Sequence, residues 1–133
     1  MHLIFCVDEQ CGLSFCGRRL SRDQEVSEHI LQLSNGHPLW MSPNSASLFP
    51  KATGIVDPDF LKKASIGDYC FAEAPITVDS VHGLESVILY RWNRRYPSTE
   101  KLCREILTGM HLSHTEEFPG KSHEKITMER YTL

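Results

Sequence analysis

The feature that most limits the fold is the apolar run at the start of the chain, "HLIFCVD". Residues 3–7 are apolar without interruption, and the turn "EQCG" follows Asp8. A short continuous apolar run is typical of a strand that is buried on both faces. This run is too short for a signal peptide or a membrane-spanning helix. We therefore expect a cytoplasmic protein, with no membrane partner, whose sheet has residues 2–7 in its interior.

Two longer segments carry helical signals. In residues 22–33 the apolar side chains recur at helical spacing, Ser21 with Gln24 matches a capping box, and "SNGHP" ends the pattern. In "GIVDPDFLKKA", Asp57 is placed to open a second helix with Pro58 in its first turn. Between them, "SPNSASLF" predicts a further short helix.

The remaining apolar segments predict strands. "PLWM", "GDYCFAEA" and "ESVILYRW" are typical of strands, and "HLSHTEEF" and "KITMERYTL", joined by the turn "PGKSH", predict a closing hairpin. The chain shows no internal repeat and no linker, and its 133 residues suit one domain. We predict a single α/β domain over residues 1–133. A mixed central sheet is flanked by helices and ends in a C-terminal antiparallel hairpin over residues 111–133.

Charge and cysteine content limit the classes of partner and site. The net charge is −3, whereas nucleic-acid-binding domains are normally basic, so we do not expect nucleic acid as a partner. Cys6, Cys11 and Cys16 are evenly spaced and do not form the Cys-x2-4-Cys pairs of structural zinc sites. The five cysteines are an odd number, and cytoplasmic cysteines are normally reduced. We predict no metal, and buried thiols at Cys6 and Cys70.

The opening "LIFCVDEQCGLSFCGRR" resembles the start of dihydrofolate reductase, where a strand ending in Val-Asp runs into a glycine-containing loop. The resemblance continues through the helix at residues 22–33 and through "GHPLWMSPNS", which is similar to the strand that ends in Met-Gly-Arg-x-Thr. It resumes from "VILYRWNRRYP" to "KITMERYTL", which resemble the last strands and the C-terminal hairpin. The resemblance implies a dihydrofolate reductase-like fold with a shortened middle.

The chain also resembles a group of small bacterial proteins that share "YRWNRxYP" and "EFPGxSHEKIT" and often carry the label ribonuclease Z. Ribonuclease Z activity rests on two metals held by a His-x-His-x-Asp-His motif and further histidines. The seven histidines of this chain do not form that motif. The residues therefore do not support the label.

Departures from the reductase pattern imply that hydride chemistry is lost. The family carries an acid on its first helix that helps to protonate the pterin. Asp23 lies near that position, but an ungapped match from Met41 places Val26 there, and an acid at the start of a helix also stabilises the helix dipole. Residues 42–45 replace Gly-Arg-x-Thr, and no Gly-Gly pair follows "DYCFAEA". We expect no nicotinamide cofactor.

The segment "YRWNRRYPS" combines arginines with aromatic rings, which suits a flat or anionic ligand. We predict a ligand site between the loop of residues 12–19, the start of the first helix and this segment. Alternatively, the aromatic rings are packing residues and the arginines pair with Glu73, Glu85 or Glu100. The candidate ligand-binding residues are Arg19, Asp23, Trp40, Trp92, Asn93 and Arg94.

Three functions stay open at this point. The first is a cytosolic domain that binds a small anionic or aromatic ligand without reductase activity. The second is a hydrolase or nuclease that uses Asp23, His123 and the arginine clusters; Ser122 beside His123 is a possible nucleophile, or part of a turn stabilised by Pro119 and Gly120. The third is an interaction module that forms a homodimer through an open sheet edge.

Overall fold

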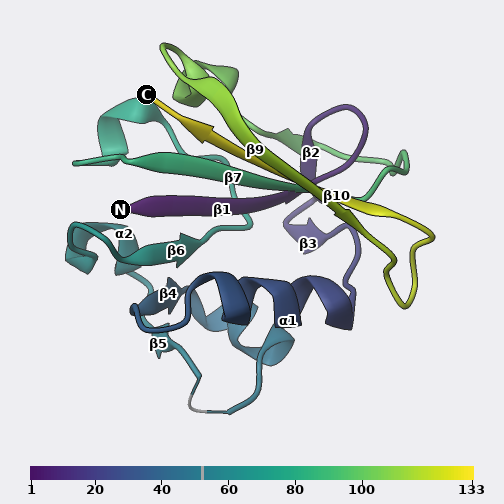
Figure 1. The fold of residues 1–133 in the computed structure, drawn as a ribbon, viewed down its shortest axis with the longest axis horizontal. Helices are drawn as coiled ribbons and strands as arrows, with labels where there is room; N and C mark the ends of the chain where they lie inside the picture. Colours follow the sequence, from purple (N-terminus) through teal and green to yellow (C-terminus); the bar gives the residue numbers. More distant parts are fainter. Residues whose placement is uncertain (52) are drawn as a thin grey trace.

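The first strand lies in the interior of a seven-stranded sheet, as predicted. The computed structural model describes residues 1–51 and 53–133 and gives the strand order β5-β4-β6-β1-β7-β10-β9 (Figure 1). Strand β1 (His2–Val7) pairs in parallel with β6 (Tyr69–Phe71) on one side and with β7 (Ser86–Arg91) on the other. Because both edges of β1 are paired, its backbone groups are satisfied within the sheet.

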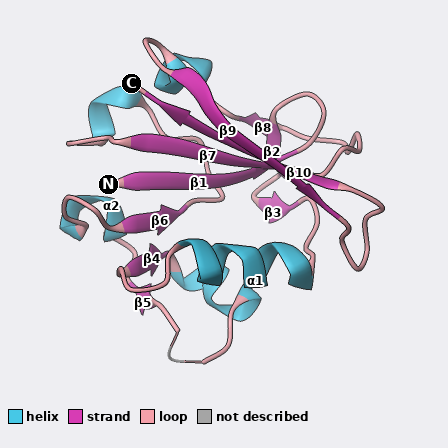
Figure 2. Ribbon diagram, viewed as in Figure 1, coloured by secondary structure: helices cyan, strands magenta, loops and turns pink. Residues whose placement is uncertain are grey.

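The sheet continues on both sides of this parallel centre and is mixed. Strands β4 (Leu39–Met41) and β5 (Ile55–Val56) extend it in parallel beyond β6. Beyond β7, the antiparallel strands β10 (Ile126–Thr132) and β9 (His111–Phe118) form the predicted C-terminal hairpin. Figure 2 shows this hairpin crossing the molecule and ending near the C-terminus. The mixed α/β prediction is confirmed.

The first helix begins later than predicted. Helix α1 spans Gln24–Leu33, and its N-cap is Asp23, whose carboxylate accepts a hydrogen bond from the Glu25 amide. The predicted cap was Ser21. Its hydroxyl instead lies 3.1 Å from a ring nitrogen of His123, so it is not available to the helix. The amphipathic pattern is otherwise as predicted.

The second helix is one turn long. Helix α2 spans Phe60–Lys63, with Asp59 at the N-cap position. Asp57 does not cap it as predicted, because its carboxylate accepts the Asp59 amide in a turn before the helix. The beginning of the same segment forms β5, which was not predicted. Within residues 1–51 and 53–133, no helix combines the length and the apolar character that a membrane crossing requires.

Short elements complete the fold and were mostly missed by the sequence patterns. A small antiparallel sheet has the order β3-β2-β8. Its strands are β2 (Gly12–Phe15), β3 (Arg18–Arg19) and β8 (Glu100–Lys101). Single-turn or short 3-10 helices lie at Pro43–Leu48, where a short helix was predicted, and at Val78–Ser80 and Arg104–Leu107.

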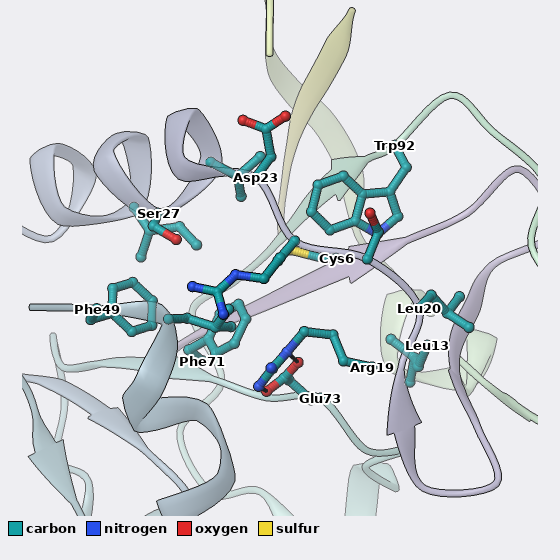
Figure 3. A pocket seen from close by; sticks show the side chains of 15 residues that line it. Cys6, Leu13, Arg19, Leu20, Asp23, Ser27, Phe49, Phe71, Glu73 and Trp92 are labelled. Atoms are coloured by element: carbon teal, nitrogen blue, oxygen red, sulfur yellow. Dashed lines mark hydrogen bonds and ion pairs between the residues drawn. The ribbon is translucent and has the colours of Figure 1, made fainter. Parts of the chain in front are cut away.

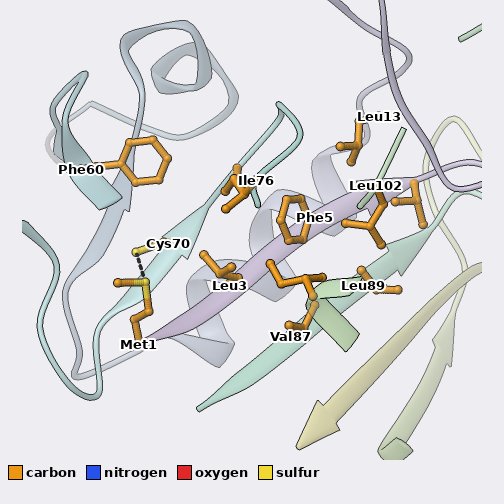
Figure 4. Close-up of a cluster of buried hydrophobic side chains, with 13 residues drawn as sticks. Met1, Leu3, Phe5, Leu13, Phe60, Cys70, Ile76, Val87, Leu89 and Leu102 are labelled. Atoms are coloured by element: carbon orange, nitrogen blue, oxygen red, sulfur yellow. Dashed lines mark hydrogen bonds between the residues drawn. The ribbon is translucent and has the colours of Figure 1, made fainter. Parts of the chain in front are cut away.

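Hydrophobic clusters cover both faces of the central sheet. Leu3 and Phe5 of β1 point to one face, where Phe60 of α2 packs (Figure 4). Ile4 points to the other face, where α1 packs through Val26 and Ile30. Alternate residues of β1 thus enter different clusters, which explains why the strand is apolar without interruption.

Cys6 and Cys70, which were both predicted to be buried, differ in their exposure to solvent. Cys70 is fully buried, and burial raises the pKa of its thiol to about 12. Cys6 is only partly buried because its side chain faces a cavity, although burial also raises the pKa of this thiol. Both thiols therefore stay protonated at neutral pH. All five cysteines are free within the described part of the chain.

Truncation of adjacent residues in β7 tests the two-faced core. Ile88 and Leu89 are fully buried, on opposite faces. We expect Ile88→Ala and Leu89→Ala each to lower the free energy of unfolding by about 2–5 kcal/mol in urea titrations. The control is Leu112→Ala in the edge strand β9, where 48% of the side chain is exposed and the expected loss is below about 1 kcal/mol. A large loss at only one of the two β7 positions would contradict the layer assignment.

Candidate functional site

Two adjoining hollows lie at the carboxyl ends of the parallel strands. The inner cavity is lined by Cys6 of β1, Phe71 of β6 and Trp92, which directly follows β7 (Figure 3). The outer hollow is lined by Ser42, which follows β4, and by Ala72, which follows β6. Loops at this edge of an open α/β sheet are where ligands usually bind. The position of the hollows therefore fits a ligand site.

The inner cavity is small and mostly apolar. Its volume is about 20 Å³, which is enough for about one water molecule. Its apolar walls come from α1 through Val26 and Ile30, and from Leu48 and Phe49. A ring-sized ligand does not fit the cavity in this conformation, whereas a methyl-sized group does.

The outer hollow is much larger and is open to solvent. Its volume is about 540 Å³, which lies within the usual range for small-molecule sites. Its apolar walls consist of Phe60, Leu61, Ala72, Pro75 and Ile76, and its polar side chains include Ser42, Asn44, Glu73 and Glu100. The outer hollow is therefore the place where a ring-sized molecule fits.

An ion pair between Arg19 and Glu73 lines both hollows. Arg19 Nε lies 2.6 Å from Glu73 Oε2, and Arg19 Nη2 lies 2.7 Å from Oε1, so the pair is bidentate. Arg19 also donates to the Asn44 carbonyl, and Ser45 donates to Glu73. The hydrogen bond to Glu73 raises the pKa of Arg19, which keeps the guanidinium charged. This ion pair forms a polar wall between the inner cavity and the outer hollow.

Asp23 lines the inner cavity, but its carboxylate points away from it (Figure 3). The carboxylate accepts hydrogen bonds from the amides of Glu25, Lys121 and Ser122, and from Nδ1 of His123 at 3.0 Å. Burial alone would raise the pKa of Asp23, but these hydrogen bonds outweigh burial and lower it to about 2. The predicted role, contact with a ring nitrogen of the ligand, does not agree with this geometry because the oxygens are already bonded within the protein.

His123 joins the hairpin turn to the rest of the site. Its Nε2 atom lies 3.1 Å from the Ser21 hydroxyl and 3.0 Å from the Tyr96 hydroxyl. Its ring stacks on Trp92, with centroids 4.6 Å apart. The group Asp23, His123, Ser21 and Tyr96 is called the histidine cluster below. Ser122 contributes only its backbone amide, so the structure does not assemble the Ser122–His123 pair considered from sequence.

Three predicted site residues lie away from both hollows. Trp40 donates from Nε1 to Asp68 at 2.9 Å and packs against the core. Asn93, at a backbone φ of 58°, donates to Thr127 of β10. Arg94 is exposed, and it does not line either hollow. The structure brings together the other three, which are Arg19, Asp23 and Trp92.

The predicted absence of metal stays a prediction. Within residues 1–51 and 53–133, no three His, Cys, Asp or Glu side chains are arranged to hold an ion.

Comparison with known proteins identifies the fold. No protein-family model matches the sequence, and no curated protein matches it. Among solved structures, the chain is similar to dihydrofolate reductase from Enterococcus faecalis, which was solved with NADP(H) and a compound called RAB-propyl. The TM-score is 0.62 at 9% sequence identity, and the match covers 98% of this chain and 94% of the reductase chain. The predicted dihydrofolate reductase-like fold is therefore confirmed. Identity this low shows the fold alone.

The outer hollow does not fit a nicotinamide dinucleotide. The pyrophosphate of such a cofactor needs cationic groups and free backbone amides. The hollow instead presents the carboxylates of Glu73 and Glu100, and the one guanidinium among its described lining residues, Arg19, is held by Glu73. Pro75 has no backbone N–H to offer. We therefore derive no hydride transfer for this chain.

The stability contributed by Asp23 is testable through its pH dependence. Its pKa is lowered from 3.8 to about 2, a difference worth about 2 kcal/mol. A lowered folded-state pKa means that this contribution is complete above pH 4 and is lost as the pH falls through about 2. We expect Asp23→Asn to lower the free energy of unfolding by about 2 kcal/mol at neutral pH.

Urea titrations at several pH values measure this effect. We expect wild type to lose stability more steeply than Asp23→Asn between pH 4 and pH 2. The control Asp79→Asn changes an exposed acid outside the histidine cluster and should follow wild type. Parallel curves for wild type and Asp23→Asn would contradict the expectation.

Proposed function

We propose that this chain binds a small, flat ligand in the outer hollow and that it does not transfer hydride. The observation that carries the proposal is a hollow of about 540 Å³ with apolar walls at the carboxyl ends of parallel strands. Size and position both suit a ligand with one or two rings.

The polar groups narrow the ligand class. Hydrogen bonds engage Nε and Nη2 of Arg19, and among the residues that the structure describes Nη1 has no partner. Nη1 is therefore free to donate to a carbonyl or a single carboxylate on the ligand. Glu73 and Glu100 repel ligands with several negative charges. A neutral or singly charged aromatic compound fits better than a polyphosphate.

Three observations support the absence of reductase activity. Val26 of α1 lines the inner cavity, at the position where the ungapped match places the reductase acid. The Asp23 carboxylate is turned toward the hairpin, and the Arg19–Glu73 pair stands between the two hollows. Neither Val26 nor Asp23 thus offers a proton to a bound ring, and the ion pair lies between the two hollows.

The cellular setting follows from the cysteines. Cys16 is exposed and Cys11 and Cys103 are partly exposed, and all three are free. Free exposed thiols persist where the surroundings are reducing. We therefore propose that the protein acts in the cytoplasm.

The homodimer stays a prediction. Strand β9 forms one edge of the sheet, and Leu112 is a large apolar side chain exposed on it. Glu116 and Glu117 lie on the same strand, and charges on an edge strand oppose pairing between copies.

Thermal unfolding with chosen probes tests the ligand proposal. We use 4-aminobenzoate and pterin-6-carboxylate as flat, singly charged carboxylates, and NADPH as a polyanion. At saturation we expect at least one flat carboxylate to raise Tm by roughly 5–10 °C, and NADPH to leave Tm unchanged. Ala74→Arg places a long side chain at an exposed lining position of the outer hollow and should abolish the rise.

A matched variant controls for the added charge. Ile66→Arg places the same side chain at an exposed apolar position in the turn before β6, at the opposite end of that strand, and should keep the rise. No rise with either carboxylate, or a rise that persists in Ala74→Arg, would refute the proposal.

Absence of hydride transfer has its own assay. Because the outer hollow lacks cationic groups for the pyrophosphate, we expect no oxidation of NADPH by dihydrofolate, followed by NADPH absorbance. The control is Ala74→Arg, which fills the outer hollow. Turnover by wild type that disappears in Ala74→Arg would show that the site does carry out the reaction.

A further inference from the structure

Ser21, His123 and Asp23 form a chain of hydrogen bonds beside the inner cavity. The Asp23 carboxylate lies 3.0 Å from His123 Nδ1, and His123 Nε2 lies 3.1 Å from the Ser21 hydroxyl oxygen. Acid, imidazole and hydroxyl follow one another in the order that activates a serine for nucleophilic attack. The distances are those of hydrogen bonds in both steps.

The carboxylate fixes which nitrogen of the His123 ring carries the hydrogen. Asp23 is 4% exposed and is held by the amides of Glu25, Lys121 and Ser122 as well as by the ring. A carboxylate at Nδ1 accepts the N–H at that position, so Nε2 of the neutral ring is the acceptor. The basic nitrogen of His123 therefore faces the Ser21 hydroxyl.

The inner cavity reaches this group at Ser21. Ser21 is half-buried and lines the inner cavity, whereas His123 is almost fully buried and stacks on Trp92. Ser21 therefore lies between the cavity that it lines and the imidazole to which its hydroxyl is hydrogen-bonded. Because the imidazole is buried, the base that would activate the nucleophile is shielded from water.

We propose that Ser21 is a nucleophile activated by His123 and that the site hydrolyses small esters with short acyl groups. Ser21 Oγ bonds to the carbonyl carbon while its proton passes to His123 Nε2. The bond to the leaving alcohol then breaks, and the alcohol takes that proton. A water molecule then gives a proton to the same nitrogen while its oxygen bonds to the acyl carbon. The bond from that carbon to Ser21 Oγ breaks, Oγ takes the proton back from His123, and the free acid leaves. This activity does not rest on the ligand proposed for the outer hollow.

The dimensions of the cavity define the acyl group. With about 20 Å³ and apolar walls, the cavity has room for the methyl of an acetyl group but not for a longer chain. Arg22 also lines the cavity, and its contact with the Ser47 carbonyl is long, at 3.5 Å. Its guanidinium is therefore free to turn toward the oxyanion that forms during attack.

Tyr96 provides a readout that distinguishes catalysis from a structural role. Its hydroxyl lies 3.0 Å from His123 Nε2 and competes with Ser21 for the same lone pair. Removal of this hydroxyl makes Nε2 fully available to Ser21. If the histidine cluster only stabilised the fold, the same change would have no reason to increase reactivity.

The experiment combines hydrolysis of p-nitrophenyl acetate with labelling by a fluorophosphonate and mass mapping of the labelled residue. We expect wild type to hydrolyse the acetate faster than the p-nitrophenyl hexanoate, and the fluorophosphonate to modify Ser21. Ser21→Ala should lose both activities, and His123→Gln should lower the rate by roughly a hundredfold. Tyr96→Phe should raise it by about fivefold, the equivalent of one hydrogen bond.

Controls separate loss of folding from loss of chemistry. Ser113→Ala, which removes an exposed hydroxyl on β9, should leave rate and labelling unchanged, and circular dichroism should show that Ser21→Ala keeps its fold. The proposal is overturned if Ser21→Ala hydrolyses the acetate as fast as wild type, or if the probe modifies another residue. A folded Tyr96→Phe variant with a lower rate would overturn it as well.

Discussion

The buried carboxylate of Asp23 is the interaction on which the site depends. It caps α1 through the Glu25 amide and at the same time holds the β9–β10 turn through two backbone amides and His123. The turn approaches so closely that a Cβ atom at Gly120 would lie 2.5 Å from the Asp23 carboxylate. The position of the imidazole is therefore set by a helix start and by a hairpin turn together, and neither element alone would fix it.

The fold is kept through extensive change of sequence. The chain shares its arrangement of strands with a reductase structure to which it is only 9% identical. Apolar burial on both faces of β1 and β7 is enough to define the sheet. Polar groups at the sheet edge, such as the Arg19–Glu73 pair, are not part of this apolar core. They can therefore change without loss of the sheet.

Sequence patterns predicted the elements whose signals are local. The unbroken apolar run of β1, the helical spacing in α1 and the alternation in the closing hairpin are all visible within a few residues. The local pattern placed the cap of α1 at Ser21. The hydroxyl of Ser21 is instead bonded to His123, 102 residues away in the chain, and a local pattern cannot show a partner at that separation. Trp40, Asn93 and Arg94 were assigned to the site from their chemistry and from the cleft that the resemblance implies, and they line neither hollow. Strands of two residues, such as β3 and β8, are too short to show an alternation of apolar and polar residues.

The position of β7 in the sheet has a consequence for synthesis of the protein. This strand pairs with β1, which precedes it in the chain, and with β10, which follows it 35 residues later. Until residue 132 has emerged, the nascent chain exposes one edge of "SVILYR", together with the apolar positions that Ile126 and Met128 later cover. Unpaired edges of this kind associate with other chains. The fold is therefore completed only after translation of β10, and until then the apolar edge of β7 is open to association with other chains.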